Sequence, residues 1–236
     1  MVKAEVKALR EDEVTLEVTA DRADMFSSEG IARSLKGFLE IELGTPKYPI
    51  REARKDFKVK VDSSVREVRP FIACAAVLDC TLGEEGLRQL IQLQETLHKT
   101  HGRDRRRFAI GLHNLDVIKP PITYIAKPFD DFSFIPLEEG REMSGKEIIE
   151  KHPKGIKYGW IIRDKGLAPL LVDANDNVLS MPPIINSDLT RVAANTRNLF
   201  IDVTGTDLKA VESAIAILVA NLAERGGKIV KFEVQE

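Results

Sequence analysis

The sequence predicts an α+β fold in which layered, mixed and largely antiparallel sheets are flanked by helices. Short strand-like segments, either alternating or continuously apolar, recur along almost the whole chain. Only three or four segments place their apolar residues at helical spacing. So many strands with so few helices argue against a regular βαβ winding and for a layered α+β domain.

The first 50 residues predict a strand-helix element that ends in a linker. Residues 2–19 alternate charged and apolar side chains, as a half-buried strand or hairpin does. Residues 25–43 predict a helix, with Ser27 or Ser28 as the N-cap and Gly44 as the stop. Residues 44–56 combine two prolines with mixed charge, so we predict a domain boundary near residue 50 and the units 1–50 and 51–236.

The remaining residues predict one larger domain. We expect strands or strand ends at 57–62, 69–80, 107–118, 122–128, 159–162, 168–173, 177–185, 198–207 and 228–234. Helices are expected at 83–100 and 208–225, and Ser144 and Glu147 form the capping-box pattern of a third, short helix. The polar run 173–177 indicates a hairpin turn.

Composition and charge exclude several classes of protein. The chain has 35 Lys and Arg against 37 Asp and Glu, a formal net charge of -2, so no global basic field attracts nucleic acid. The charged N-terminus lacks the apolar core of a signal peptide, and the longest apolar run, 214–220, is too short to cross a bilayer. We therefore expect a soluble, cytoplasmic protein. Cys74 and Cys80 fit no zinc or disulfide pattern, and no metal or cofactor is expected.

Familiar catalytic motifs are absent from the sequence, including the phosphate-binding loop, the dinucleotide glycine motif, His-Glu-x-x-His and Gly-x-Ser-x-Gly. Polar residues inside apolar segments are the remaining candidates, because burying such a group unpaired costs about 1–3 kcal/mol. His113 is a candidate acid, base or hydrogen-bond donor to a ligand. The alternative is a simple turn in which Asn114 and Asp116 bond their own backbone.

Two later segments carry further candidates. Pro182 and Pro183 end sheet pairing and stiffen the backbone that leads to Asn186, which suits either a pocket rim or a plain edge turn. Within 198–207 the strand period puts Asp202 and Thr204 on one face, opposite the apolar side chains. These two residues face water, a partner loop or a ligand.

The segment 99–107 is strongly basic. Five Lys or Arg less one Asp give a charge of +4 in nine residues, against -2 for the whole chain. The segment is a candidate phosphate-contacting loop, with Arg103, Arg105, Arg106 and Arg107 as the contacting residues. The alternative is a solvated loop.

Six blocks follow one another along the chain: DRADMFSSEGIAR (21–33), VRPFIA (68–73), LQETLH (93–98), AIGLHNLD (109–116), LSMPPIIN (179–186) and TRNLFIDVTGTD (196–207). In this order they resemble the archaeal and eukaryotic phenylalanyl-tRNA synthetase β subunit, specifically its B3/B4 editing region with the preceding strand-helix element. The chain departs from that family at Asn114, where Asp is usual, and at Ser187, where Gly is usual. We therefore expect no catalytic base at position 114.

The resemblance implies post-transfer editing, in which an aminoacyl-tRNA ester hydrolase removes tyrosine wrongly esterified to the 3′ acceptor end of phenylalanine tRNA. The family's pocket residues correspond to Leu171, Ser180, Asp202 and Thr204, and His113 and Asn186 are further candidates. Leu171 would pack on the tyrosine ring, and the other three would bind the aminoacyl group, the phenol hydroxyl or the attacking water. No nucleophile with a base partner is visible, so direct attack by a positioned water is expected.

The resemblance also implies partners, namely tRNA at the basic loop and the synthetase α subunit if the chain is part of a full-length β subunit. We expect an excised module or a free-standing relative that does not aminoacylate by itself. The alternative is a non-catalytic tRNA-docking or subunit-interaction module with the same fold. An open pocket lined by Ser180, Asp202 and Thr204 would favour catalysis.

Overall fold

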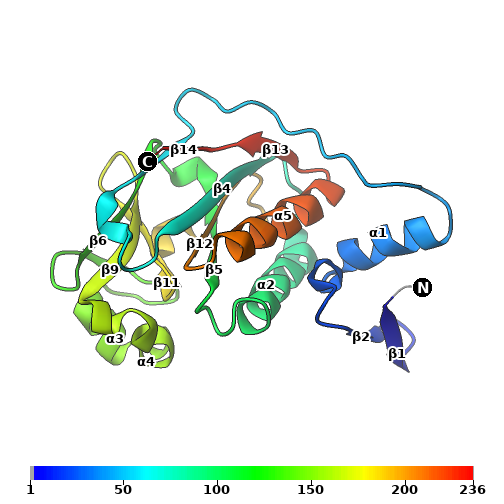
Figure 1. Cartoon of the computed structure of the whole chain (residues 1–236), viewed down its shortest axis with the longest axis horizontal. Helices are drawn as coiled ribbons and strands as arrows, with labels where there is room; N and C mark the ends of the chain where they lie inside the picture. The colour runs from blue at the N-terminus through cyan, green and yellow to red at the C-terminus, as the bar shows by residue number, and fades with distance from the viewer. Residues whose placement is uncertain (1–2, 236) are drawn as a thin grey trace.

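The computed structural model describes residues 3–235 and has a mixed α+β architecture (Figure 1). Two large sheets pack face to face, and two long helices cover the outer face of the smaller sheet. Two strand pairings in the larger sheet are parallel and the other pairings within the sheets are antiparallel. The predicted mixed α+β class is therefore confirmed.

The four-stranded sheet carries the predicted polar strand at its centre. Its order is β13 (Lys228–Lys231), β4 (Phe71–Leu78), β12 (Leu199–Gly205) and β5 (Phe108–Asn114), so β5 is an edge strand. The two long helices, α2 (Gly83–Lys99) and α5 (Leu208–Glu224), pack on one face of it. Leu199, Ile201 and Val203 point into this helix-facing core, so the strand period puts Asp202 and Thr204 on the other face, as predicted.

The six-stranded sheet packs against that other face. Its order is β11 (Ile185–Asn186), β10 (Val178–Met181), β9 (Leu167–Val172), β6 (Ile122–Pro128), β3 (Lys58–Val61) and β14 (Glu233–Gln235). The predicted hairpin joins β9 to β10 through 173–177. Two short helices, α3 (Gly145–Lys151) and α4 (Pro153–Tyr158), add apolar residues to the core between the sheets. A small pair of strands, β7 (Ser133–Phe134) and β8 (Met143–Ser144), precedes them.

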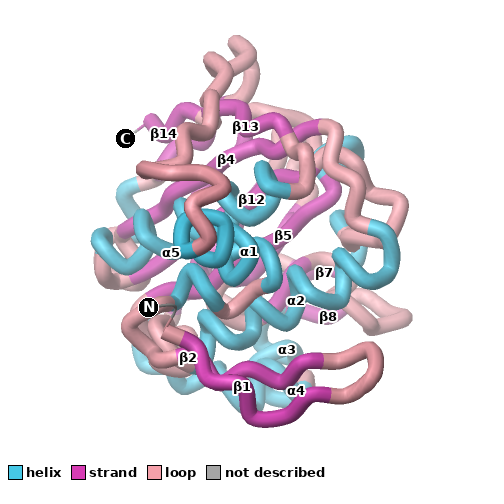
Figure 2. The backbone as a smooth tube through the Cα atoms, turned by 90° about the vertical axis from the view of Figure 1, so that its right-hand side faces the viewer, coloured by secondary structure: helices cyan, strands magenta, loops and turns pink. Residues whose placement is uncertain are grey.

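The N-terminal residues form a hairpin and a helix beside this core. The hairpin consists of β1 (Ala4–Leu9) and β2 (Val14–Val18), and the helix is α1 (Ser28–Phe38), capped by Ser27. Figure 2 looks at this side of the molecule, with the hairpin in front of the helices. Segment 39–57 then crosses the molecule without a helix or strand, apart from an isolated bridge between Arg51 and Val230 (Figure 1). The division near residue 50 remains a prediction.

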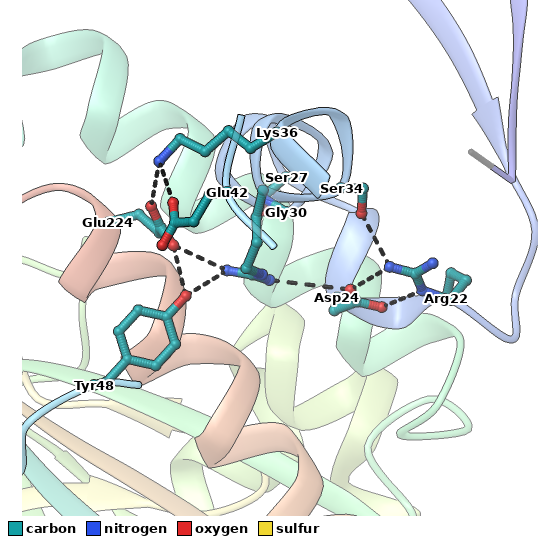
Figure 3. Close-up of polar contacts among 10 residues, drawn as sticks. Arg22, Asp24, Ser27, Gly30, Ser34, Lys36, Glu42, Tyr48 and Glu224 are labelled. Carbon is teal, nitrogen blue, oxygen red and sulfur yellow. Dashed lines mark hydrogen bonds and ion pairs between the residues drawn. The ribbon is translucent and has the colours of Figure 1, made fainter. Parts of the chain in front are cut away.

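A polar network holds α1 and the linker against the end of α5 (Figure 3). The hydroxyl of Tyr48 donates to Glu224 at 2.5 Å and accepts from Arg33 at 3.2 Å. Lys36 lies 3.5 Å from Glu42 and 3.8 Å from Glu224. The network therefore ties a helix, a linker residue and the distant C-terminal helix together.

Several predicted elements differ from the structure. The first helix ends at Phe38 instead of running to Leu43, because Glu40 adopts a left-handed φ of 58° and the amide of Ile41 donates back to the carbonyl of Lys36. The stop is therefore not at Gly44. The predicted strand at 159–162 is wrong, since 159–161 is a turn of 3-10 helix that continues α4. A four-residue apolar run has no periodicity to distinguish the two states.

The predicted final strand 228–234 is two strands, β13 and β14, in different sheets, and the predicted strand 107–118 ends at Asn114 and is followed by 3-10 helix. Other predicted boundaries agree more closely with the structure. The predicted strand at 122–128 coincides with β6. The side chain of Ser144 accepts from the amide of Glu147, while the Glu147 side chain accepts from the amide of Ser144, so the capping box is confirmed.

Candidate active site

A cavity of about 690 Å³ opens along the free edge of β5. One wall comes from α2 and the opposite wall from the turn that follows β10, with further residues from 137–139, 152–154 and 190–192. The α2 wall consists of Leu87, Ile91, Gln94, Glu95 and His98. The cavity is therefore bounded by an edge strand, a helix and a proline-rich turn.

Side chains form hydrogen bonds with the backbone groups along this free edge of β5. Gln94 donates to the carbonyl of Ile110 at 2.8 Å, and the amide of Ile110 donates to Nε2 of His98 at 2.8 Å. Further along, Asn186 donates to the carbonyl of Leu112 at 3.1 Å. Unpaired strand edges invite pairing with other chains, so these side chains also block that pairing. Asn186 lines the cavity, and its side chain holds the end of the proline-rich turn to β5.

Asp202 enters the cavity wall from the central strand β12. It lies opposite Gly111 of β5 in the sheet register and is only 1% exposed. A Cβ at position 111 would lie 2.0 Å from Oδ1 of Asp202 and 2.7 Å from Nε2 of His113. The carboxylate therefore occupies space that only glycine leaves free.

His113 is paired with this carboxylate. Its Nε2 lies 2.9 Å from Oδ1 of Asp202, and its Nδ1 lies 2.7 Å from the hydroxyl of Thr190. The imidazole therefore bridges the Asp202 carboxylate and the Thr190 hydroxyl. The predicted turn after His113 is also present, because the Asn114 side chain accepts from the amide of Asp116 at 3.1 Å. The predicted turn is therefore confirmed for Asn114 and Asp116. His113 is fully buried and does not line the cavity, and its role toward a ligand stays a prediction.

Thr204 lies on the same face of β12 but belongs to a closed buried cluster. Its hydroxyl accepts from Nε of Arg69 at 3.0 Å, and Tyr124 donates to the carbonyl of Arg69 at 2.7 Å. Arg69 and Thr204 are fully buried, and neither lines the cavity. Burial lowers the pKa of Arg69 to about 10, so it stays cationic at neutral pH, and Asp202 opposes the shift.

Leu171 and Ser180 lie on the opposite sheet. They are neighbours in the β9–β10 pairing, and Leu171 also lies beside Tyr124 of β6. Both are buried, and neither lines the cavity. Among residues 3–235 the hydroxyl of Ser180 has no hydrogen-bond partner. Of the four main predicted pocket residues, Asp202 alone therefore lies in the cavity wall.

The four predicted phosphate-contacting arginines have different surroundings. Arg103 and Arg106 are exposed, while Arg107 is half-buried and bonds Asp207 through Nη2 at 2.7 Å. Arg105 is 7% exposed, lines the cavity and donates to the carbonyls of Pro183 and Ile184. Of these four arginines, Arg103 and Arg106 are the ones that are exposed and make no ion pair within residues 3–235.

Glu95 and His98 are cavity residues that the sequence reasoning did not identify. Nδ1 of His98 donates to Glu95 at 3.3 Å, while Nε2 accepts from the amide of Ile110, so the imidazole is neutral. Burial lowers the pKa of His98 to about 4, and the hydrogen bond from His98 lowers the pKa of Glu95 to about 2. Both residues lie in the block 93–98, whose helical spacing gives no sign of their position at an edge strand.

Cys74 is the pairing neighbour of Asp202 on β4. Burial raises the pKa of the Cys74 thiol well above its usual value, and the Asp202 carboxylate adds to the shift. A thiolate nucleophile is therefore disfavoured at this position.

In the part of the chain that the structure describes, no three His, Cys, Asp or Glu side chains are grouped as metal ligands would be. None of the helices in residues 3–235 has the length and apolar character needed to span a bilayer.

Comparison with known proteins identifies close relatives. The β subunit of phenylalanine–tRNA ligase from Methanosphaera stadtmanae is 44% identical over 234 residues, which are 99% of this chain and 42% of that protein. The corresponding subunit from Korarchaeum cryptofilum is 50% identical over 225 residues, which are 94% of this chain and 40% of that protein. No protein-family model matches the chain.

A solved structure is also similar. It is the crystal structure of an N-terminal fragment of the phenylalanyl-tRNA synthetase β subunit from Pyrococcus horikoshii. The match has a TM-score of 0.94 and 45% identity, and it covers 99% of this chain and 68% of that fragment. The chain spans 40–42% of the length of the two curated relatives. Because the identity is high over two thirds of a solved relative, the chain belongs to the phenylalanyl-tRNA synthetase β-subunit family.

Proposed function

We propose that this chain is a B3/B4-type editing module, which hydrolyses tyrosine esterified to the 3′ end of phenylalanine tRNA. The observation that carries the proposal is the buried carboxylate of Asp202 in the wall of a 690 Å³ cavity. Pockets for small ligands typically measure roughly 300–1,000 Å³, so the cavity suits an aminoacyl group with part of the terminal nucleotide. Membership of the β-subunit family supports the same assignment.

The chemistry needs a positioned water, and Asp202 is suited to hold one. His113, itself held by Thr190, bonds Oδ1 of the carboxylate, and within residues 3–235 no hydrogen bond reaches Oδ2. We assign Oδ2 to the attacking water. The water oxygen bonds the ester carbonyl carbon, the bond to the ribose oxygen breaks, and the water proton passes through the carboxylate to that oxygen. The products are free tyrosine and tRNA with its 3′ hydroxyl restored.

Selection of tyrosine requires a polar group that reads the phenol hydroxyl. A site built to bond a hydroxyl discriminates sharply against the analogue that lacks it. The buried hydroxyl of Ser180 is unpartnered in the described residues, next to Leu171. We propose that Leu171 and Ser180 contact the phenol ring and its hydroxyl, which requires the wall between them and the cavity to rearrange when the substrate binds, because neither residue lines the cavity.

The second candidate is a non-catalytic module that docks tRNA or another subunit. The observation that favours it is that Ser180 and Thr204 are buried outside the cavity and that Thr204 is already bonded to Arg69. In either case we propose that the exposed Arg103 and Arg106 contact tRNA and that the synthetase α subunit is a partner of the full-length subunit.

Hydrolysis of charged tRNA separates the two candidates. We expect the protein to release tyrosine from tyrosyl-tRNA(Phe) much faster than phenylalanine from phenylalanyl-tRNA(Phe), assayed alone and within a full-length β subunit bound to α. Asp202→Asn should reduce the rate by at least about 100-fold, which is the usual contribution of a positioned base. Asp164→Asn, at an exposed site, is the matched control. Equal decay of both esters in every format would support the docking module and contradict editing.

A further inference from the structure

The basic loop contains a strained turn. Arg103, Asp104 and Arg105 have φ values of 48°, 53° and 67°, three consecutive non-glycine residues in the left-handed region. Such residues are uncommon singly, and three in succession are energetically unfavourable. Strain of this kind persists only where the surrounding structure imposes it, and it is concentrated at functional sites.

The consequence of the turn is that Arg105 points inward while its neighbours stay at the surface. Nη1 of Arg105 donates to the carbonyls of Pro183 and Ile184, each at 3.0 Å. Its guanidinium also lies 4.4 Å from the centre of the Tyr158 ring. Pro183 and Ile184 both line the cavity, so Arg105 is bonded directly to the proline-rich rim of the cavity.

The α2 wall holds the other side of the same guanidinium. Nη2 of Arg105 donates to Glu95 at 2.8 Å, and Glu95 is bonded in turn to His98. The arginine therefore joins the two opposing walls of the cavity, α2 on one side and the turn after β10 on the other.

Buried Arg69 fixes the backbone of the loop from inside. Its Nη2 donates to the carbonyl of Arg105 at 3.0 Å, and the same nitrogen bonds the carbonyl of Thr204 at 2.9 Å. Meanwhile Nε of Arg105 is buried and has no partner among residues 3–235. An unpaired buried donor and a strained backbone both cost stability, so the arrangement is not explained by stability alone.

We propose that Arg105 is a positioning residue, which sets the width of the cavity by fixing its 182–184 rim to α2. The proposal rests on the proposed editing function for its effect on catalysis. It assigns Arg105 to the substrate cavity and removes it from the candidate tRNA contacts, because its charge is paired inside the protein.

Arg105→Lys is the main test. Lysine keeps the cation but lacks the planar fork that reaches two carbonyls and a carboxylate at once. We expect kcat for tyrosyl-tRNA hydrolysis to fall about 10- to 100-fold, the effect of losing hydrogen bonds to a charged group. KM for tRNA and its salt dependence should stay near wild type. Arg66→Lys, at an exposed site, is the matched control.

Hydrogen exchange tests, without any substrate, whether Arg105 fixes the 182–184 rim to α2. Amides of residues 184–187, which follow the two prolines, should exchange about 10- to 100-fold faster in Arg105→Lys than in wild type, with Arg66→Lys unchanged. If Arg105→Lys does not fold, Glu95→Gln, which keeps the shape of the partner, should show the same pattern with a smaller change.

Two results would overturn the proposal. One is wild-type exchange at the amides of 184–187 in the folded variants. The other is a raised KM with a flattened salt dependence and unchanged kcat, which would make Arg105 a tRNA contact. If the wild-type protein hydrolyses no ester, the editing proposal fails. The exchange measurement still shows whether Arg105 fixes the rim to α2.

Discussion

Replacing Gly111 with alanine tests whether the position of the Asp202 carboxylate depends on a missing side chain. The new Cβ would lie 2.0 Å from Oδ1 of Asp202, far inside van der Waals contact. Either the carboxylate turns away and breaks its bond to His113, or β5 moves away from β12. Breaking a hydrogen bond to a charged group costs about 1.5–3 kcal/mol, and overpacking a core costs about 1–3 kcal/mol.

The less costly route sets the outcome, so we expect Gly111→Ala to lose about 1–3 kcal/mol of unfolding free energy. For a domain of this size that corresponds to roughly 2–12 °C in Tm. Gly140→Ala is the matched control, because Gly140 is exposed and a Cβ added there would have no other atom within 4 Å. Its unfolding free energy should change by no more than about 0.5 kcal/mol.

Urea unfolding followed by circular dichroism measures both variants, and tyrosyl-tRNA hydrolysis measures the effect on the site. We expect Gly111→Ala to lose activity along with stability, since in one route the carboxylate turns and in the other His113, which lies on β5, moves away from it. If Gly111→Ala matched Gly140→Ala in unfolding free energy and the wild type in hydrolysis, the geometry of Asp202 would not depend on Gly111, and the reasoning would be refuted.

Three further predictions concern pH, RNA and the amino acid. Because the pKa of His98 is about 4 in the folded protein and about 6.5 when unfolded, the unfolded state binds more protons between these values and stability falls as pH drops. Urea unfolding should show a loss of about 2 kcal/mol between pH 7 and pH 5 from this residue, absent in His98→Gln and retained in His101→Gln. Arg103→Ala with Arg106→Ala should lower the log-log salt slope of tRNA binding by up to about 0.9 per contact on a duplex, and an unchanged slope would place the RNA elsewhere. Free tyrosine should bind about 2- to 10-fold more tightly than phenylalanine for each hydrogen bond to its hydroxyl, and equal calorimetric affinities would contradict a site that reads it.

Local patterns in the sequence were sufficient for most of the elements. The period of two in 198–207 placed Asp202 and Thr204 on the face opposite the helices, and the Ser144–Glu147 pattern marked the start of α3. These signals work because side-chain direction and helix capping depend on residues a few positions apart. The end of α1 and the turn at 159–161 were missed because their signals were too short or came from an unusual residue, Glu40, in the left-handed region.

The site itself depended on contacts between distant segments. His113 meets Asp202 only because β5 and β12 are neighbours in one sheet, and Glu95 reaches Arg105 only because the loop after α2 folds back in a left-handed turn. The charges of 99–107 were evident in the sequence, but the backbone turn decided that Arg105 lies inside and Arg106 outside. Sequence alone determined which side chains share a face of an element, since that follows from local backbone geometry. Tertiary structure decided which faces meet, because strand pairing and side-chain burial depend on contacts between segments that are far apart in the sequence.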